Sequence, residues 1–397
     1  MKEEADSAEN KAVVADREKN RKGVSRRTFV KGLSAMGAGT IFFSGVAKQA
    51  RGQYGSTHID GLSAKQLTAM YTDMLKIRLW ESKVKDLILM GGFRGAAHLY
   101  VGEEAIAVGV CSALRKDDYI ASTHRGHGHL IAKGGDLGLM LAEITHKATG
   151  YCKGYGGSMH ITDMSLGILG MNGIVGVSHL LAAGAAYGVK VKETDQVAVS
   201  FGGDGSLQNS FFSSGANAAA AWKLPWIGII ENNAFQIWVR SSDVYGIADL
   251  ARRADGYGIE GRVVDGNDVL SVYNVAKYAV QKARDGKGPT IIECKTYRWY
   301  DHYGVRGARI GVDGAFRLGY RSDRELRDWM AKDPIRRFRE FLLREEVLTA
   351  ERADKIVAEV RQAVEDAAEF AKAQPVPKPE DGLVNVFAEG AVRLHTS

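Results

Sequence analysis

Two short polar clusters, held a set distance apart, dictate much of the fold of this chain. Gly203-Asp204-Gly205 is the first and Asn232-Asn233 is the second, so that Asp204 and Asn233 are 29 positions apart. A buried strand is predicted over residues 197–201, and the interval contains a predicted helix over 211–222 and a strand over 226–230. Each cluster therefore follows a strand of one strand-helix-strand unit, and ligands bind at the carboxyl ends of such strands.

The residue types in the two clusters favour a divalent cation that holds a phosphorylated ligand. A carboxylate and a carboxamide offer hard oxygen atoms, which suit a Mg²⁺ ion that bridges a diphosphate. Glycines on both sides of Asp204 let the backbone approach the phosphates, and a following helix N-terminus favours an anion. The alternative is a Gly-Asp-Gly turn and an unrelated pair of asparagines in a loop.

The rest of the chain predicts an α/β fold with a mostly parallel sheet flanked by helices. Further strands are expected over residues 262–264 and 290–296. Further helices are expected over residues 63–89, 103–114, 137–145, 180–190 and 267–284. Strands that alternate with helices in this way indicate parallel pairing. After residue 321 the pattern is helical, and Ile356, Val360 and Val364 repeat at the spacing of a helix predicted over 350–373.

Five further blocks, taken in order with the two clusters, carry a resemblance to a known family. They are 122–128 (STHRGHG), 153–160 (KGYGGSMH), 170–176 (GMNGIVG), 221–225 (AWKLP) and 288–293 (GPTIIE). GDG followed at this distance by NN resembles the thiamine-diphosphate motif. Together, the blocks resemble the α subunit of the decarboxylating component of 2-oxo acid dehydrogenases, a pattern shared by pyruvate, branched-chain and acetoin dehydrogenases. The resemblance covers residues 62–389 and implies a thiamine-diphosphate-binding fold.

The resemblance assigns the cofactor's diphosphate to the two clusters. The positions that match the family's Mg²⁺ ligands are Asp204, Asn233 and the backbone carbonyl of Phe235. The positions that match diphosphate-binding residues are Gly203, Gly205, Ser206 and Arg125. The guanidinium of Arg125 suits a diphosphate because it can donate two parallel hydrogen bonds. The resemblance therefore implies thiamine diphosphate and Mg²⁺ as cofactors.

The resemblance also implies residues beside the reacting part of the cofactor. Gly173 and Val175 match a stretch whose backbone contacts the aminopyrimidine ring. His127 and His302 match two histidines near the thiazolium and the substrate, and His302 is expected to contact the cofactor as well. Such histidines can orient the substrate, stabilise developing charge and transfer protons near neutral pH.

Neighbouring polar residues are expected to have structural roles. His124 and His129 lie with His127 in a glycine-rich segment that reads as a loop, and no partnered ligand cluster accompanies them as a zinc site would require. We therefore expect structural contacts from His124 and His129. Arg298 either steadies the loop before His302 or pairs with an acid at the surface.

The implied activity is that of a dehydrogenase α subunit that needs a β subunit. The resemblance implies oxidative decarboxylation of pyruvate or a related 2-oxo acid, or cleavage of acetoin, with acyl transfer to the lipoyl group of an acyltransferase. In the family the activating glutamate comes from the β subunit. Glu103 and Glu104 stand at a predicted helix start, where capping and interface contacts are expected. The chain alone is therefore expected to be inactive, and its complete site to lie in a heterotetramer of two α and two β chains.

Three other interpretations stay open. The chain could be a transketolase-like or other non-oxidative thiamine enzyme, a non-catalytic subunit that keeps the cofactor, or a metal-dependent hydrolase that uses the histidine segment. Residues 206–210 and 304–309 depart from the usual pattern of the family. These departures put the substrate, rather than the cofactor, in question.

Residues 1–55 are predicted to be a leader and linker. Residues 25–31 (SRRTFVK) match the twin-arginine pattern, and the mildly apolar run 33–46 that follows is too short for an ordinary membrane span. This predicts export of the folded protein to the periplasm by the Tat route; the alternative is a basic tail on a cytoplasmic protein. Residues 56–330 are then expected to form the diphosphate-side α/β domain, and 331–397 a helical C-terminal extension and tail.

Charge and cysteine content exclude several classes of function. The net charge is +6, but residues 1–50 hold ten lysines and arginines against six acidic residues, so the remainder is close to neutral. With no basic stripe of interleaved aromatic residues, nucleic-acid binding is not expected. Cys111, Cys152 and Cys294 are scattered and odd in number, which is not typical of a disulfide framework or a metal site. No transmembrane span is expected in the mature chain.

Overall fold

Six parallel strands form the central sheet of the computed structural model, which describes residues 61–93, 95–305 and 318–384. Across the sheet, the strands lie in the order β2 (Ile168–Gly170), β1 (Tyr119–Ala121), β3 (Ala198–Gly203), β4 (Trp226–Asn232), β8 (Thr290–Lys295) and β7 (Glu260–Asp265). All of these pairings are parallel. After β1 the chain adds β2 on one side of it and then β3 on the other side. The order of strands therefore reverses between β1 and β3, and the carboxyl ends of these two strands lie at the point of reversal. The predicted α/β class is confirmed.

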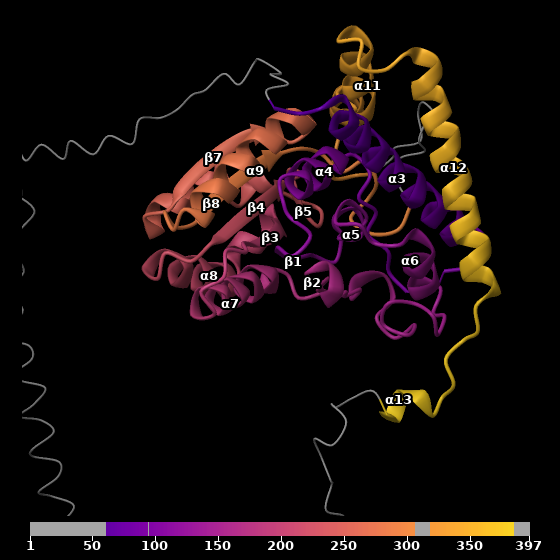
Figure 1. Cartoon of the computed structure of the whole chain (residues 1–397), viewed down its shortest axis with the longest axis horizontal. Coiled ribbons are helices and arrows are strands. Elements are labelled where there is room, and N and C mark those ends of the chain that lie inside the picture. The colour runs from indigo at the N-terminus through magenta and orange to yellow at the C-terminus, as the bar shows by residue number, and fades with distance from the viewer. Residues whose placement is uncertain (1–60, 94, 306–317, 385–397) are drawn as a thin grey trace, which may run out of the picture. The chain divides into compact units, whose positions relative to one another are not determined.

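Helices cover both faces of the sheet (Figure 1). The described α-helices are α3 (Ala64–Leu89), α4 (Glu104–Ser112), α5 (His127–Ala132), α6 (Leu137–Ile144), α7 (Val177–Val191), α8 (Ser210–Ala221), α9 (Val269–Arg284), α10 (Asp323–Met330), α11 (Pro334–Arg344), α12 (Ala350–Ala373) and α13 (Asp381–Val384). The short 3-10 helices are η1 (Gly157–Met159), η2 (Met164–Leu166), η3 (Asp204–Gln208), η4 (Ser241–Asp243) and η5 (Leu250–Tyr257).

Alternation of side chains along each strand creates a separate core on each face of the sheet. In β4, Ile227 and Ile229 belong to the core that α3, α4, α9 and α12 cover. Trp226 and Ile230 belong to the second core, which contains apolar residues of α7, α8 and η5. These side chains are almost fully buried, so β4 has no face in water, as expected of a strand in a parallel sheet.

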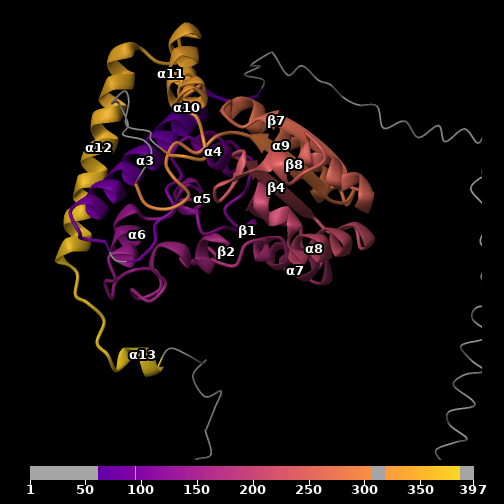
Figure 2. The ribbon, with the colours of Figure 1, turned by 180° about the vertical axis from the view of Figure 1, so that it is seen from behind.

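The long helices follow the sequence prediction closely. Ser63 caps α3: its hydroxyl accepts from the backbone of Gln66, and the Gln66 side chain accepts from the backbone of Ser63. The buried side chains Ile356, Val360 and Val364 mark the inner face of α12, which packs on α3 and α6. Figure 2 shows α12 running beside α3 from the opposite side of the molecule.

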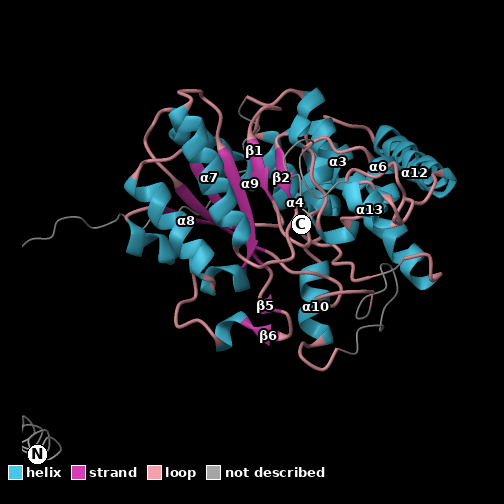
Figure 3. Cartoon of the chain, turned by 90° about the horizontal axis from the view of Figure 1, so that it is seen from below, coloured by secondary structure: helices cyan, strands magenta, loops and turns pink. Residues whose placement is uncertain are grey.

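A small hairpin lies apart from the main sheet. Its antiparallel strands are β5 (Phe235–Gln236) and β6 (Val239–Arg240), and Figure 3 shows them beside α10. A bidentate ion pair joins Arg240 to Glu325 of α10, with nitrogen–oxygen distances of 2.7 and 2.6 Å. The hairpin therefore holds the chain that follows Asn233 close to the end of β4.

Some predictions are wrong or lie outside the described residues. The segment that contains His127 and His129 was expected to be a loop but forms α5, and Gly126 and Gly128 let it pack closely against Ser122 and Tyr100. The short strands β1 and β2 were not predicted. The leader and the end of the tail lie outside the described residues, and the division at residues 330 and 331 stays a prediction. None of the described helices combines the length and the apolar character needed to cross a membrane.

Candidate active site

A cavity of about 230 Å³ lies where β1, β3 and β4 end. Ser122 follows β1, Asp204 follows β3 and Asn233 follows β4, and all three line the cavity. Nine of the eleven predicted site residues line it, namely Arg125, Val175, Gly203, Asp204, Gly205, Ser206, Asn233, Phe235 and His302. The other two, Gly173 and His127, do not. The geometry thus brings residues from three strand ends together at one place, as the sheet topology requires.

Oxygen atoms gather on one side of the cavity. The side chains of Asp204 and Asn233 are buried, and so is Phe235, whose carbonyl belongs to the same turn as Asn233. Nη1 of Arg298 donates to Oδ1 of Asn233 at 3.3 Å and to the carbonyl of Phe235 at 2.9 Å. Both oxygens therefore accept from the same cationic nitrogen. A carboxylate, a carboxamide oxygen and a carbonyl form a donor set that fits a hard cation such as Mg²⁺.

Arg298 lies at the cavity and does not pair with an acid at the surface. Its guanidinium is 1% exposed, so pairing with an acid at the surface is excluded. In addition to the contacts with Asn233 and Phe235, it donates to the carbonyl of Ile237. Arg298 therefore ties the segment before His302 to the turn that follows β4.

The carboxylate of Asp204 is held in place by the segment that follows the hairpin. Oδ2 accepts from the hydroxyl of Ser241, and Oδ1 accepts from the backbone of Gly205 at 3.0 Å. The hydroxyl of Tyr245 donates to the carbonyl of Asp204 at 2.6 Å. Burial raises the pKa of Asp204, against the effect of these donors. A bound cation would favour the ionised form.

Arg125 is a second positive group on the cavity wall, besides Arg298. It is 5% exposed, and its two terminal nitrogens donate to the carbonyls of Leu99 at 2.8 Å and His302 at 2.9 Å. Its Nε lies 4.0 Å from Oε2 of Glu103. Burial lowers the pKa of Arg125, and Glu103 acts in the opposite direction. The guanidinium is thus fixed at both ends and remains next to the cavity.

Ser206 is anchored from behind by a histidine. Nε2 of His179 lies 3.0 Å from the hydroxyl of Ser206, and its Nδ1 lies 2.9 Å from the hydroxyl of Ser200. A Cβ at Gly202 would lie 2.3 Å from Nε2 of His179, so only glycine leaves room for this ring. Burial lowers the pKa of His179 to about 3, which keeps the ring neutral. The loop after β3 is therefore supported by a fixed polar contact.

His127 lies inside the protein rather than at the cavity. It is fully buried, with Nδ1 3.0 Å from Oε1 of Glu81 and Nε2 3.0 Å from the hydroxyl of Ser158. Its ring also packs edge-on against Trp80. Both nitrogens are engaged away from the cavity, so these contacts give no support to the expected role at the substrate.

His129 is buried in a separate polar network. Its Nδ1 lies 2.8 Å from the hydroxyl of Ser122, and its Nε2 lies 2.9 Å from Oε1 of Glu231 and 3.1 Å from the hydroxyl of Tyr100. The ring stacks on Phe201 with a centroid distance of 3.7 Å. These contacts agree with the structural duty expected of His129.

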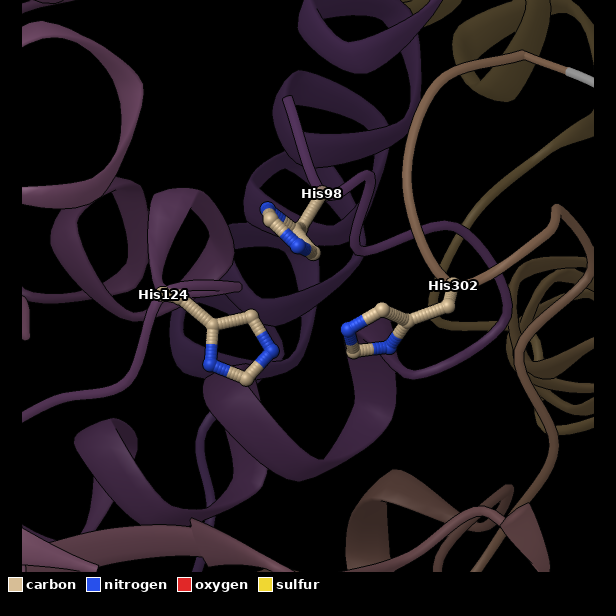
Figure 4. A group of neighbouring side chains, drawn as sticks. All are labelled: His98, His124 and His302. Atoms are coloured by element: carbon tan, nitrogen blue, oxygen red, sulfur yellow. The ribbon is translucent and has the colours of Figure 1, made fainter. Parts of the chain in front are cut away.

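His124, by contrast, lines the cavity together with His302. A third histidine, His98, lies behind them, and the three rings face one another (Figure 4). Burial lowers the pKa of His124 and of His302 to about 3, and that of His98 below its ordinary range. The expected structural role of His124 therefore does not describe its position, because the ring borders the cavity.

Glu103 is a second cavity residue that no sequence motif marks as part of the site. Its side chain is fully buried and makes no hydrogen bond that caps α4. Oε1 accepts from Nδ2 of Asn233 at 2.9 Å, and Oε2 has no hydrogen-bond partner within the described residues. Burial raises its pKa to about 8, while Arg125 acts in the opposite direction. The predicted capping role of Glu103 is wrong.

Glu104 has a structural role inside the chain. Nε of Arg78 lies 2.5 Å from Oε1 of Glu104, and Nη2 lies 3.0 Å from Oε2, so that the pair is bidentate and buried. The same guanidinium donates to Asp333, at the start of α11. These ion pairs join α3, α4 and α11 within the chain. Glu104 therefore makes an internal contact, where a contact with a partner chain was expected.

Comparison with known proteins identifies relatives that extend over most of the chain. The sequence profile of the dehydrogenase E1 component matches residues 68–380. The α subunit of an acetoin:2,6-dichlorophenolindophenol oxidoreductase from Bacillus subtilis is 43% identical over 330 residues, which cover 83% of this chain and 96% of that protein. The α subunit of the same name from Cupriavidus necator is 40% identical, over 82% and 95% of the two chains. A pyruvate dehydrogenase E1 component α subunit from Zymomonas mobilis is 37% identical, over 81% and 89%.

Proposed function

The chain belongs to the dehydrogenase E1 component family, and we propose that it is the α subunit of a thiamine-diphosphate-dependent dehydrogenase. The substrate class is pyruvate or a related 2-oxo acid, or acetoin, and the similarity to the two acetoin oxidoreductase α subunits supports acetoin. The observation that carries the proposal is the convergence of Asp204, Asn233 and Arg125 on one cavity at the strand ends. An oxygen site for a cation and a fixed guanidinium in one cavity suit a diphosphate.

Mg²⁺ and thiamine diphosphate are the proposed cofactors. Asp204, Asn233 and the carbonyl of Phe235 would hold Mg²⁺, and Arg125 with the loop from Gly203 to Ser206 would hold the diphosphate. When bound, thiamine diphosphate supplies the carbanion chemistry on the substrate carbonyl. The fit is supported by Oδ1 of Asn233 and the carbonyl oxygen of Phe235, because both already accept hydrogen bonds from the positively charged Arg298.

His302 is the residue of this chain proposed to act on the substrate. Its ring lines the cavity, while its backbone N–H donates to Oδ1 of Asp301 at 2.7 Å and its carbonyl accepts from Arg125. The backbone is thus held on both sides, which fixes where the imidazole points. Burial lowers the pKa of His302 to about 3, so the ring is neutral near pH 7 and can donate or accept a hydrogen bond.

A β subunit is proposed to complete the site at the outer face of α7. Apolar side chains recur there at helical spacing and are well exposed: Leu180, Leu181, Tyr187 and Val191. Ile174 and Val175, which line the cavity, are also exposed and precede the same helix. An exposed apolar surface that is continuous with a cavity is typical of a protein interface. A partner on this face would therefore cover the open side of the cavity.

Two measurements on the full chain, co-expressed with its β subunit, test the proposed function. First, thiamine diphosphate should bind in the presence of Mg²⁺, and Asp204→Ala should weaken that binding by about tenfold or more. Second, the complex should turn over acetoin, pyruvate or a branched 2-oxo acid with an artificial electron acceptor. Binding of thiamine diphosphate to Asp204→Ala with unchanged affinity would refute the proposed site.

Acyl transfer to a lipoyl acyltransferase is also proposed, and a lipoylated protein added as acceptor tests it.

Export by the Tat route is proposed from the sequence alone. Arg26 and Arg27 precede an apolar run, and the Tat route carries folded proteins, which suits a cofactor that is loaded before export. Residues 1–55 fused to a reporter should reach the periplasm, and changing both arginines to lysine should stop the export. Cytoplasmic retention of both fusions would reject the leader.

A further inference from the structure

Three imidazole rings from distant parts of the sequence meet beside the cavity. His98 belongs to the segment before α4, His124 to the turn before α5, and His302 to the segment after β8. Figure 4 shows the three rings facing one another, and one nitrogen of each lies within 4.8 Å of one nitrogen of each of the others. Their ring centroids are 4.5, 4.9 and 5.5 Å apart. One nitrogen of each ring is therefore close enough to the others for the three to share one ligand.

The nitrogens of the three rings are available to a ligand. His98 is 6% exposed, and its Nδ1 has no hydrogen-bond partner within the described residues. A buried polar atom without a partner costs free energy, and each such atom calls for an explanation. Among the described contacts, the rings of His124 and His302 likewise make no hydrogen bond, and both line the cavity. The arrangement therefore provides up to three free lone pairs.

The charges around the three rings do not prevent a cation from binding. Arg125 and Arg298 are the positive groups that act on these rings. The guanidinium of Arg125 is tied to the carbonyls of Leu99 and His302 and lies 4.0 Å from the carboxylate of Glu103. The guanidinium of Arg298 donates to Oδ1 of Asn233 and to the carbonyls of Phe235 and Ile237. Burial also keeps the three imidazoles neutral, which is the form that binds metal ions.

We propose that His98, His124 and His302 bind a divalent transition-metal ion, of which Zn²⁺ is the best match. Three neutral imidazoles suit zinc, nickel or copper, whereas Mg²⁺ prefers oxygen ligands. Three histidines with an open fourth position are a known zinc geometry. The fourth position would face the cavity, because His124 and His302 line it. The site is distinct from the oxygen site of Asp204 and Asn233.

Metal binding requires only a small closure of the rings. Tetrahedral coordination at about 2.1 Å from the metal places ligand nitrogens about 3.4 Å apart. The present separations of up to 4.8 Å are larger, so each ring must move inward by roughly 1 Å. His124 and His302 border the cavity, which leaves their rings room for a shift of this size toward His98.

Titration of the full chain with Zn²⁺ tests this site directly. Mg²⁺ is kept in large excess to saturate the oxygen site, and Co²⁺ is used in parallel because its absorption reports tetrahedral coordination. The wild-type chain should bind one ion at the cluster. His98→Ala, His124→Ala and His302→Ala should each weaken binding by about tenfold or more, since even a second-shell change costs that much.

Two control variants make the result specific. His160 is exposed and outside the cluster, so His160→Ala should bind Zn²⁺ as the wild type does. Asp204→Ala removes a ligand of the proposed Mg²⁺ site and should also leave Zn²⁺ affinity unchanged. This second control tests the two proposals independently. The Zn²⁺ site can be absent while the proposed Mg²⁺ site is correct, and the reverse also holds. Should His98→Ala unfold, His98→Gln with an unchanged melting temperature replaces it.

The proposal also has a consequence for activity that rests on the proposed function. A metal ion on His302 would occupy the ring proposed to act on the substrate, so Zn²⁺ should inhibit the loaded enzyme over the same concentration range in which it binds. Unchanged Zn²⁺ affinity in the histidine variants, or loss of Zn²⁺ binding in Asp204→Ala alone, would overturn the site.

Discussion

The carboxamide of Asn233 is oriented by Glu103. Nδ2 of Asn233 donates to Oε1 of Glu103 at 2.9 Å, and both side chains are buried. Because the nitrogen is taken by the carboxylate, the oxygen of Asn233 must face the other way, toward Nη1 of Arg298. A residue at the start of α4 thus decides which atom the turn after β4 presents to a cation. Outer contacts of this kind commonly tune metal ligands.

Removal of this contact should weaken Mg²⁺ binding. Glu103→Ala frees the carboxamide of Asn233 to rotate, so the Mg²⁺ concentration needed for thiamine-diphosphate binding should rise by about 10-fold to 100-fold. Glu103→Gln keeps an oxygen acceptor and should lose much less. Calorimetric titration of the cofactor at several Mg²⁺ concentrations measures both. Wild-type behaviour of Glu103→Ala would show that Asn233 is held by other contacts.

Ionisation of Glu103 should make stability depend on pH. Its folded pKa of about 8 lies above the ordinary value of 4.5, so the folded cofactor-free chain holds this proton more tightly than the unfolded chain does. Stability from this group is therefore present below pH 4.5 and is lost as the pH rises toward 8. Glu103→Gln cannot ionise, so the difference between its melting temperature and that of the wild type should increase in favour of the variant as the pH rises from 4.5 to 8. The gain should level off above pH 8, at a free energy on the order of a few kcal/mol. A constant difference across the window would contradict the buried carboxylate.

The buried ion pair between Arg78 and Glu104 should be costly to break. Glu104→Ala leaves a buried guanidinium without its bidentate partner, and we expect a loss of about 3–5 kcal/mol in the free energy of unfolding. The double variant Arg78→Met and Glu104→Leu should recover much of the loss, because no fully buried charge is then left unpaired and Asp333, which also loses Arg78, is partly exposed. As a control, Arg352→Ala removes an exposed pair with Glu359 and should hardly change the melting temperature. Equal effects of the two single variants would contradict the role of burial.

Gly176 should not tolerate a side chain. Its φ of 92° lies in the left-handed region, and a Cβ there would lie 2.9 Å from the Cβ of Asn209. Gly176→Ala should lower the free energy of unfolding by more than about 1 kcal/mol and should weaken cofactor binding, since Gly176 lines the cavity. Gly184 lies within α7 with no atom near its added Cβ, so Gly184→Ala should stabilise the isolated chain slightly. Thermal melting of the two variants gives the comparison.

Substitution on the outer face of α7 should prevent assembly without harming the fold. Leu181 is 43% exposed, so Leu181→Glu should keep the melting temperature of the isolated chain. The same variant should no longer co-purify with the β subunit, because a charge would be buried in the proposed interface. Arg361→Glu, on the exposed face of α12, is the matched control and should assemble normally. Normal assembly of Leu181→Glu would place the β subunit elsewhere.

Much of the sheet could be predicted because its central strands are unbroken apolar runs. Trp226 to Ile230 is buried on both sides, and the helices beside it repeat apolar residues at helical spacing. By contrast, β1 and β2 have three residues each, which is too short for periodicity to separate a strand from a loop. The six-residue helix α5 was hidden by the glycines in its first turn and cap.

The site could be predicted only where its residues lie near one another in sequence or match a motif. Asp204 and Asn233 follow consecutive strands of one unit, so their meeting follows from the topology alone. Glu103 reaches the cavity, and His98 the histidines that line it, from a segment about a hundred residues earlier, and no local pattern marks them. His127 was assigned to the substrate because it matches a histidine of the family. The sequence could not show that α5 buries this ring, whereas His124, in the turn before α5, borders the cavity.

The packing of α12 on α3 has a consequence for how the protein is made. The buried side chains of Ile356, Val360 and Val364 cover a helix that is synthesised almost three hundred residues earlier, and Lys83 pairs with Glu365 across the contact at 2.5 Å. While the ribosome is still elongating the chain, the part of α3 that α12 covers stays open to solvent, although α4 and α5 can already pack on the rest of the helix. The native packing of α3 therefore cannot be complete before the C-terminal helix has been synthesised.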